Sequence, residues 1–169
     1  KNIGIGAFII PTNTQGLEIG KKEKKMGWRA SDTRKIYFDN MKVDSENILF
    51  LPKNGIDEFF RGLTPARISI GALSVGTATA AYEKALVYSK DRVAFNKPIN
   101  HFQSNSFKLA DMATKIEASR LLVYHAAWLK DQGKNFLKEA AMAKLYASES
   151  AMKITREAIQ IHGGYGYVH

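Results

Sequence analysis

The sequence predicts an α+β chain in which an antiparallel β segment is followed by an antiparallel helical bundle. Up to about residue 52, short runs of β-branched and aromatic residues alternate with polar residues and are separated by polar turns. After Gly55, apolar residues recur at helical spacing, and the long helical stretches are joined by short connections. Two parts are therefore expected, residues 1–52 and residues 53–169.

Four short strands are expected in the first part. Each is an apolar run that ends at a proline, a glycine or a polar turn, which are common ends of strands. The turns between them are short, so antiparallel pairing is expected. The runs are residues 3–10, ending at Pro11; residues 17–20, after a turn at 12–16; residues 35–43, with a turn or bulge at Asp39-Asn40; and residues 48–51, closed by Pro52.

Three helices are expected in the second part. Pro65 should start or kink the first, because proline lacks an N–H and clashes with the preceding helical turn. Alanines on one face of the third helix allow close packing against its neighbours. The expected helices run from Ile56 to about Leu86; from about Asn100 to Gln132, with Gly133 as the stop; and from near Asn135 to Gly163-Gly164.

Composition excludes several classes of chemistry. The 169 residues carry a formal charge of +9 and no cysteine, which excludes a disulfide scaffold, a cysteine-ligated metal and a thiol nucleophile. No run approaches 18 apolar residues, so no transmembrane helix is expected. The four histidines lack an HExxH spacing and the serines lack a GxSxG elbow, which disfavours metal and hydrolytic chemistry. The lysines of residues 21–25 are interpreted as a solvated hairpin.

Three segments are candidates for a site, each with a structural alternative. Residues 92–99 contain a guanidinium and an aromatic side chain in a loop, which form either a helix connection or a ligand loop for a phosphate and an apolar surface. Residues 160–167 contain three glycines within four residues, which form either a helix end or a close approach of backbone N–H groups to a ligand. Arg67, among apolar neighbours, needs an anionic or acceptor partner, which a structural salt bridge would also supply. His162 is more often a packed or capping residue than a ligand.

Six segments together resemble the acyl-CoA dehydrogenase family, most closely its short-chain (butyryl-CoA) members. They are MGWRASDT (26–33), GLTPARISIG (62–71), RVAFNKPINHFQ (92–103), LADMATKIEASRLLVYHAAW (109–128), KEAAMAKLYASE (138–149) and QIHGGYGYVH (160–169). The resemblance implies that residues 1–52 form the C-terminal part of a middle β-domain, a partial β-barrel. It implies that residues 53–169 form most of a C-terminal helical domain. The absence of an initial methionine and the stop after a glycine-rich turn add the expectation that the chain is a piece of a longer protein.

The resemblance also implies a cofactor and a set of site residues. FAD would lie between subunits of a homotetramer, held by Arg92 and Phe95 of the loop, by Gln103, and by Gln160, Gly163 and Gly164. Arg67 would have a substrate-side or site-shaping role in the acyl-CoA cleft. Two departures from the family pattern are Asn96 in place of a loop glycine, where asparagine tolerates positive φ, and Thr64 at a position that is often acidic.

The activity implied is α,β-dehydrogenation of a short-chain acyl-CoA to its trans-2-enoyl-CoA, with electrons passing to an electron-transfer flavoprotein. The glutamate base is expected beyond His169, because Ala66 stands where some members carry it, so no catalytic residue is assigned within the chain and the chain alone is expected to be inactive. No metal, nucleic acid or membrane is expected as a partner. The expected location is a bacterial cytoplasm, with the mitochondrial matrix as the alternative. A related oxidase or hydroxylase, and a non-catalytic helical module that docks an acidic partner or nucleic acid, are the alternatives for function.

Overall fold

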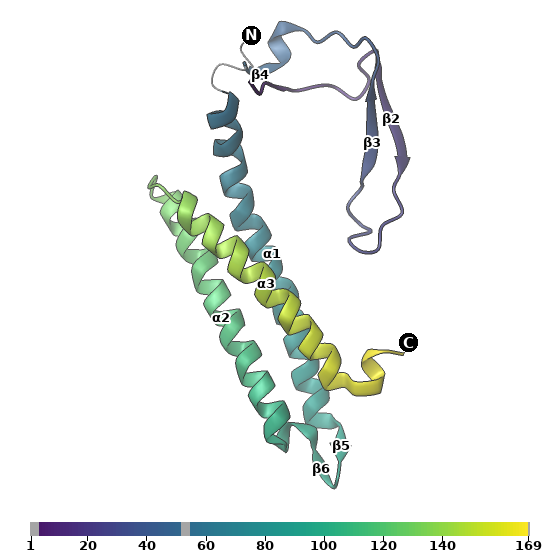
Figure 1. Cartoon of the computed structure of the whole chain (residues 1–169), viewed down its shortest axis with the longest axis vertical. Coiled ribbons are helices and arrows are strands. Elements are labelled where there is room, and N and C mark those ends of the chain that lie inside the picture. Colours follow the sequence, from purple (N-terminus) through teal and green to yellow (C-terminus); the bar gives the residue numbers. More distant parts are fainter. Residues whose placement is uncertain (1–3, 52–54, 169) are drawn as a thin grey trace. The chain divides into compact units, whose positions relative to one another are not determined.

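The computed structural model describes residues 4–51 and 55–168. It contains short antiparallel strands followed by three helices, which confirms the predicted fold class (Figure 1). The chain divides into two compact units, Lys1–Phe60 and Arg61–His169.

The first unit contains two pairs of antiparallel strands. Strand β1 (Ala7–Phe8) pairs with β4 (Ile48–Phe50), and β2 (Leu17–Lys22) pairs with β3 (Arg34–Phe38), so that Leu17 lies opposite Phe38 and Ile19 opposite Ile36. A short 3₁₀ turn, Ser45–Asn47, precedes β4. Each strand overlaps an expected run. β1 and β4 are shorter than their runs, β2 extends two residues past Gly20, and β3 begins one residue before Lys35 and ends at Phe38.

The turns of this unit depend on residues that tolerate unusual backbone angles. Gly16 has a φ of +85°, and a Cβ there would lie 2.3 Å from the carbonyl oxygen of Asp39, so this position requires glycine. Asn40 has a φ of +45° and ends the β3 segment, which confirms the turn expected at Asp39-Asn40. These two residues determine how β2 meets β3.

The second unit is an antiparallel three-helix arrangement. Helix α1 (Gly55–Asp91) leads to a small hairpin of β5 (Val93–Ala94) and β6 (Lys97–Pro98), and then α2 (Gln103–Asp131) and α3 (Leu137–His162) run antiparallel to each other (Figure 1). Gly133, with a φ of +64°, follows the end of α2 as expected. Among the described residues no helix is both long and apolar enough to span a bilayer.

Two helix ends bear on the expectations. Helix α1 starts at Gly55, next to the expected Ile56, and continues through Pro65, so of the two alternatives for this proline a helix start is excluded and a kink stays a prediction. The second helix starts at Gln103 rather than near Asn100. Residues Ile99–His101 form a 3₁₀ turn instead, and Phe102 is extended, with a ψ of 127°. The hairpin β5–β6 was also not expected within residues 92–99.

The helical core lies where all three helices meet, and small residues allow the close approach. A Cβ on Gly71 of α1 would lie 3.0 Å from a methyl of Val123 on α2 and 3.6 Å from the backbone of Ala143 on α3. At the outer edge, Lys108 of α2 pairs with Glu157 of α3 at 2.5 Å. The larger core cluster consists of Ala78, Ala85, Leu109, Met112, Ile116, Ala151, Ile154, Ala158 and Ile161.

Candidate functional site

The connection between α1 and α2 is a tight hairpin with an exposed tip. The backbone N–H of Arg92 still donates to Tyr88 at 2.9 Å, and the carbonyl of Arg92 accepts from the N–H of Ile99 at 2.9 Å, which closes the hairpin. The two tip residues, Phe95 and Asn96, have φ values of 50° and 63°, as a two-residue turn with left-handed positions requires. Asn96 therefore occupies a left-handed turn position, which asparagine tolerates.

The Phe95 side chain does not enter the helical core. It is 91% exposed at the tip of the hairpin, and its ring meets that of Phe102 edge-on at 6.2 Å. The ammonium of Lys97 lies 4.3 Å from the centre of the Phe102 ring. The tip thus presents a strained, exposed aromatic side chain, which is the geometry of a contact residue rather than of core packing.

The glycines that follow α3 differ in how much space surrounds their Cα atoms. Gly163 has a φ of +57°, and a Cβ at Gly163 or Gly164 would meet nothing within 4 Å. A Cβ at Gly166, in contrast, would lie 2.5 Å from the carbonyl oxygen of Ile159. Gly166 is therefore required by packing, whereas Gly163 and Gly164 leave open space beside the backbone that a ligand could approach.

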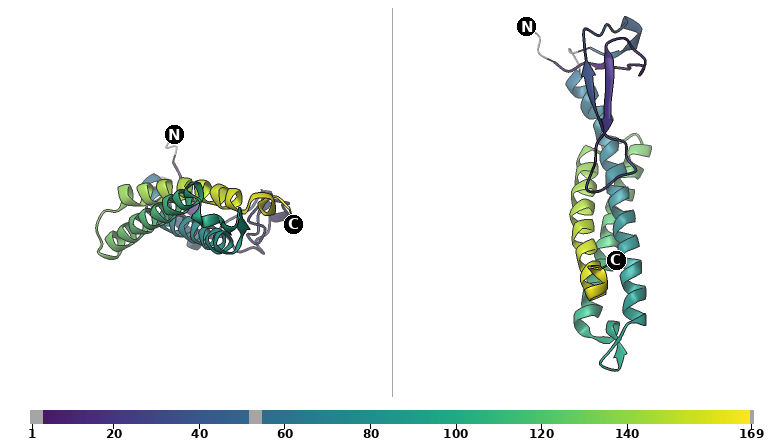
Figure 2. Two further views of the ribbon diagram at one scale, coloured as in Figure 1. Left: turned by 90° about the horizontal axis from the view of Figure 1, so that it is seen from below. Right: turned by 90° about the vertical axis from the view of Figure 1, so that its right-hand side faces the viewer.

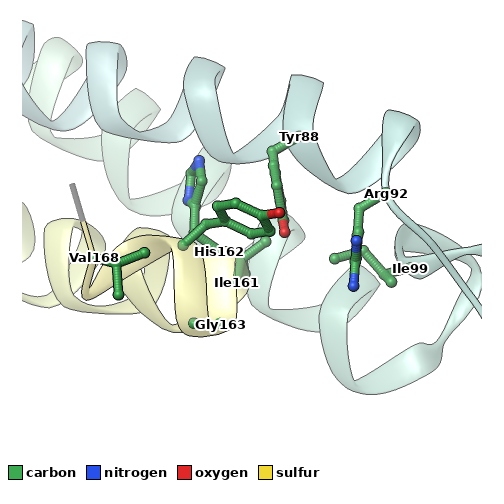
Figure 3. Close-up of a pocket in the computed structure, with 9 residues that line it drawn as sticks. Tyr88, Arg92, Ile99, Ile161, His162, Gly163 and Val168 are labelled. Atoms are coloured by element: carbon green, nitrogen blue, oxygen red, sulfur yellow. The ribbon is translucent and has the colours of Figure 1, made fainter.

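A cavity of about 440 Å³ brings the two segments together (Figure 3). Arg92 and Tyr88 reach it from the end of α1, and His162, Gly163 and Gly164 border it from the end of α3. The other lining residues are Ile99, Ile161, Tyr165 and Val168. Arg92 thus makes one side of the cavity positively charged, and Gly163 and Gly164 form a side where no side chain covers the backbone. The other lining side chains are aromatic and aliphatic.

His162 is held by two contacts that set its orientation. Its ring stacks on Tyr88, with centroids 4.5 Å apart and 24° between the planes. Its Nδ1 lies 2.7 Å from the carbonyl oxygen of Ala158, which can only accept, so Nδ1 carries the proton. Tyr165 adds a second ring 6.3 Å from Tyr88. His162 is packed, as expected, and it also borders the cavity.

The expected site residues only partly converge. Arg92, Gly163 and Gly164 line one cavity, whereas Phe95, Gln103 and Gln160 do not line it. Gln103 is the first residue of α2, and Gln160 lies in the last turn of α3; both side chains are exposed. Sequence reasoning did not identify Tyr88, Ile99 or Val168 as cavity residues. The one signal available for Tyr88 was its spacing, one helical turn before Arg92.

Arg67 lies on α1 and is half-buried. Within the described ranges 4–51 and 55–168 it forms no hydrogen bond or ion pair. The structural salt bridge considered from the sequence is therefore not formed with these residues, and the guanidinium remains available to an anionic group. Across the same described residues there is also no group of three His, Asp or Glu side chains arranged to hold a metal ion.

Comparison with known proteins places the chain in a family. The family model described as "Acyl-CoA dehydrogenase, C-terminal domain" matches residues 53–169. The probable acyl-CoA dehydrogenase YngJ of Bacillus subtilis is 49% identical over 168 residues, which cover 99% of this chain and 44% of that protein. The chain belongs to the acyl-CoA dehydrogenase family.

Solved structures agree with this assignment. The butyryl-CoA dehydrogenase of Megasphaera elsdenii superimposes with a TM-score of 0.95 at 49% identity, over 99% of this chain and 44% of that one. A second match is a chain of the structure described as "Electron transferring flavoprotein of Acidaminococcus fermentans: Towards a mechanism of flavin-based electron bifurcation". It has a TM-score of 0.93 at 45% identity, over 96% of this chain and 43% of that one. The chain thus spans less than half the length of the relatives it matches.

The side chains around the cavity fit part of a flavin nucleotide. Members of this family are flavoproteins, and FAD contains a pyrophosphate between two aromatic ring systems. Arg92 offers a planar, permanently charged donor for phosphate oxygens. Gly163 and Gly164 leave their backbone open, and the rings of Tyr88 and Tyr165 offer apolar surfaces. This donor set suits a diphosphate with an attached ring, so the residues present fit the cofactor.

Proposed function

We propose that the protein that carries this chain is an FAD-dependent acyl-CoA dehydrogenase that oxidises a short-chain acyl-CoA to its trans-2-enoyl-CoA. The observation that supports it most is the convergence of Arg92 with the open backbone of Gly163 and Gly164 on one cavity, in a chain 49% identical to a butyryl-CoA dehydrogenase. FAD, when bound, supplies the hydride acceptor for the β-carbon of the substrate. The part of the protein described here supplies binding and orientation.

The proposed cofactor contacts fall into two groups. Arg92 would bind the pyrophosphate through charge-assisted hydrogen bonds, and Gly163 and Gly164, which carry no side chain, would let it lie close to their backbone. Phe95, Gln103 and Gln160 lie outside this cavity, on an exposed hairpin tip and on two exposed helix ends. We assign them to parts of FAD that extend beyond the cavity, including the part shared with a second subunit.

Arg67 is proposed to act on the substrate side. Its guanidinium is half-buried and has no partner in the described ranges, so an anionic group of the acyl-CoA would satisfy it. No residue of this chain is proposed as the base that removes the α-proton, since Ala66 beside Arg67 cannot accept a proton. The base is proposed to be a glutamate that follows His169 in the protein's sequence.

The remaining assignments follow from the family. Residues 1–52 would be the C-terminal part of the middle β-domain, and residues 53–169 would belong to the C-terminal helical domain. Electrons would pass to an electron-transfer flavoprotein, an acceptor suggested by the matched Acidaminococcus structure. The protein would be a homotetramer that shares FAD between its subunits. It would be located in the bacterial cytoplasm or in the mitochondrial matrix.

The test is steady-state oxidation of butyryl-CoA by the protein that carries this chain, with an electron-transfer flavoprotein as acceptor and the enoyl-CoA product measured directly. We expect product with butyryl-CoA and a decline in kcat/KM as the acyl chain is lengthened. The Arg67→Lys variant should raise KM more than it lowers kcat, because a point charge replaces a planar donor. Product formation with oxygen as the acceptor and none with the flavoprotein would favour an oxidase instead.

The 169-residue chain by itself is expected to form no product, because the proposed base is absent from it. Turnover by this chain alone, after its purity has been verified by mass spectrometry, would contradict the assignment of the base.

A further inference from the structure

The loop that connects β2 to β3 lines a cavity of its own. Residues 23–33 form this loop, which closes one end of the hairpin in the right-hand view of Figure 2. The cavity has a volume of about 510 Å³ and is lined by Lys22, Glu23, Lys24, Lys25 and Arg29. Four cationic side chains and one carboxylate thus surround one space. The solvated hairpin expected at residues 21–25 therefore also forms a concave and strongly positive surface.

Hydrogen bonds across the loop hold its shape. The ammonium of Lys25 donates to the carbonyl oxygen of Ser31 at 2.8 Å and to Oγ1 of Thr33 at 2.9 Å. At the base of the loop, the backbone N–H of Glu23 donates to the carbonyl oxygen of Thr33 at 2.9 Å. Lys25 is half-buried and links the two sides of the loop, so the cavity belongs to the folded loop itself.

A tight turn brings Arg29 to the cavity. The N–H of Ser31 donates to the carbonyl oxygen of Trp28 at 3.1 Å, which closes a turn with Arg29 as its second residue. Trp28 has a φ of 52°, a value that bulky side chains rarely adopt. The turn thus contains an unfavourable backbone angle, and it places the guanidinium of Arg29 around the same space as Lys22 and Lys24.

Three of the four cations have no hydrogen-bond or ion-pair partner among residues 4–51 and 55–168; these are Lys22, Lys24 and Arg29. The carboxylates of the hairpin are engaged with other cations. Glu23 lies 4.0 Å from the ammonium of Lys35, and Asp32 accepts two hydrogen bonds from Arg34. Like charges that share a small space repel one another, and an anion bound among them removes that repulsion.

We propose that this cavity binds a small phosphorylated anion through a diphosphate group. Arg29 offers a planar set of donors, and Lys22 and Lys24 offer point charges on flexible stems, a combination that suits phosphate oxygens. A diphosphate carries several negative charges in a small volume and offsets the excess of positive charge better than a single carboxylate does. The site shares no residue with the cavity of Arg92, so the inference is independent of the proposed function.

The lining of the cavity disfavours two other anionic partners. Proteins bind single-stranded nucleic acid in positive grooves that carry aromatic rings for base stacking, and none of the residues lining this cavity is aromatic. An extended acidic peptide requires cations arranged along a line. The cations here come from one short segment, residues 22–29, that folds around one space.

Isothermal titration calorimetry tests the site in the protein that carries this chain, with excess FAD present and inorganic diphosphate as the probe. We expect saturable binding of one diphosphate per chain, weakened by added salt because Lys22, Lys24 and Arg29 are exposed. Lys24→Gln and Arg29→Gln should each raise the Kd about tenfold, since each removes a charge-assisted hydrogen bond. Lys21→Gln removes the same charge from a neighbour outside the lining, and it should change the Kd by less than about threefold.

A second probe distinguishes two sources of the diphosphate group. ADP carries the same group on a nucleoside. If ADP binds as tightly as inorganic diphosphate, with the same loss in Lys24→Gln, the site takes a nucleotide. If ADP binds more weakly, the site takes the free anion, because the nucleoside then adds only a steric cost.

Chemical labelling locates the ligand without any substitution. Acetylation of lysine side chains by acetic anhydride, measured by mass spectrometry, should decrease at Lys22 and Lys24 when diphosphate is present. It should be unchanged at Lys21 and at the exposed Lys144 of α3. The absence of saturable binding, equal Kd values for the variants at positions 21, 24 and 29, or labelling of Lys22 and Lys24 that diphosphate does not change would each overturn the proposal.

Discussion

The ring of His162 stacks on the ring of Tyr88 at 4.5 Å and thereby joins the end of α3 to the last turns of α1. Tyr88 lies one helical turn before Arg92, and His162 directly precedes Gly163. The contact therefore sets the separation between the guanidinium of Arg92 and the open backbone of Gly163. Two segments that are 71 residues apart in the sequence line one cavity partly because of this pair.

Tyr88→Leu should loosen this link. The leucine keeps much of the apolar contact but removes the ring stack, which contributes about 0.5–1.5 kcal/mol in other aromatic pairs. We expect a loss of that size in the free energy of unfolding, measured with urea, and weaker binding of FAD. Tyr124→Leu, at an exposed tyrosine of α2, is the control and should change neither quantity appreciably. Unchanged FAD binding in the Tyr88 variant would contradict a role for the stack in shaping the site.

Arg92→Ala should weaken FAD binding without unfolding the protein, because Arg92 is exposed and lines the cavity. Hydrogen bonds to charged groups contribute about 1.5–3 kcal/mol, which corresponds to a Kd about 10- to 150-fold higher. Lys90→Ala, two residues earlier on α1 and outside the cavity lining, should leave the Kd unchanged. The measurement is a fluorescence titration of apoprotein with FAD. Equal Kd values for the two variants would remove Arg92 from the proposed contacts.

Substitutions at Gly163 and Gly164 allow an effect on folding stability to be distinguished from an effect on FAD binding. Gly163→Ala forces a residue with a Cβ into a φ of +57°, and we expect it to cost about 1–3 kcal/mol of folding free energy. Gly164→Ala meets no such strain, since its Cβ would contact nothing within 4 Å, so its stability should be close to that of the parent. If a ligand approaches this backbone, Gly164→Ala should still weaken FAD binding. Normal FAD binding by a stable Gly164→Ala protein would argue against that approach.

The β2–β3 hairpin should lose stability in acid through Asp32. The guanidinium of Arg34 donates to both carboxylate oxygens at 3.0 Å and lowers the pKa of Asp32 below its usual value of 3.8. Because the pKa is lowered in the folded state, the stabilisation is present above pH 3.8 and is lost as the pH falls through the lowered pKa. The effect should be small, since both groups are exposed. Protection factors of the β2 and β3 amides, in which the exchange rates are corrected for their intrinsic pH dependence, measure it from pH 6 to pH 2, and Asp32→Asn should reduce the change in protection.

The periodic parts of the fold could be predicted from the sequence because burial of one face determines them. Alternating residues predicted runs that overlap β2, β3 and β4, and alanines at helical spacing predicted α3, whose buried side includes Ala143, Ala147 and Ala158. Pro65 lies inside α1, which begins ten residues earlier at Gly55, so a proline alone does not determine where a helix starts. The 3₁₀ turn before Gln103 was missed because such short turns leave no periodic pattern.

The site could be predicted only in its chemically distinctive residues. Arg92 and the glycines stood out by type, and they line one cavity. Tyr88 did not stand out, because its contribution depends on stacking with His162, a residue far away in the sequence. The different roles of Gly164 and Gly166 were also hidden, since only the folded backbone brings Ile159 against Gly166.

An anaerobic titration of the protein that carries this chain with butyryl-CoA tests the central claim most directly. The visible absorption band of the bound flavin is followed as substrate is added. Bleaching of the band at stoichiometric butyryl-CoA is the predicted result, because removal of the α-proton and transfer of a hydride reduce the flavin without oxygen. A flavin that binds the ligand but stays oxidised, or a protein purified without flavin that binds none, would contradict the account.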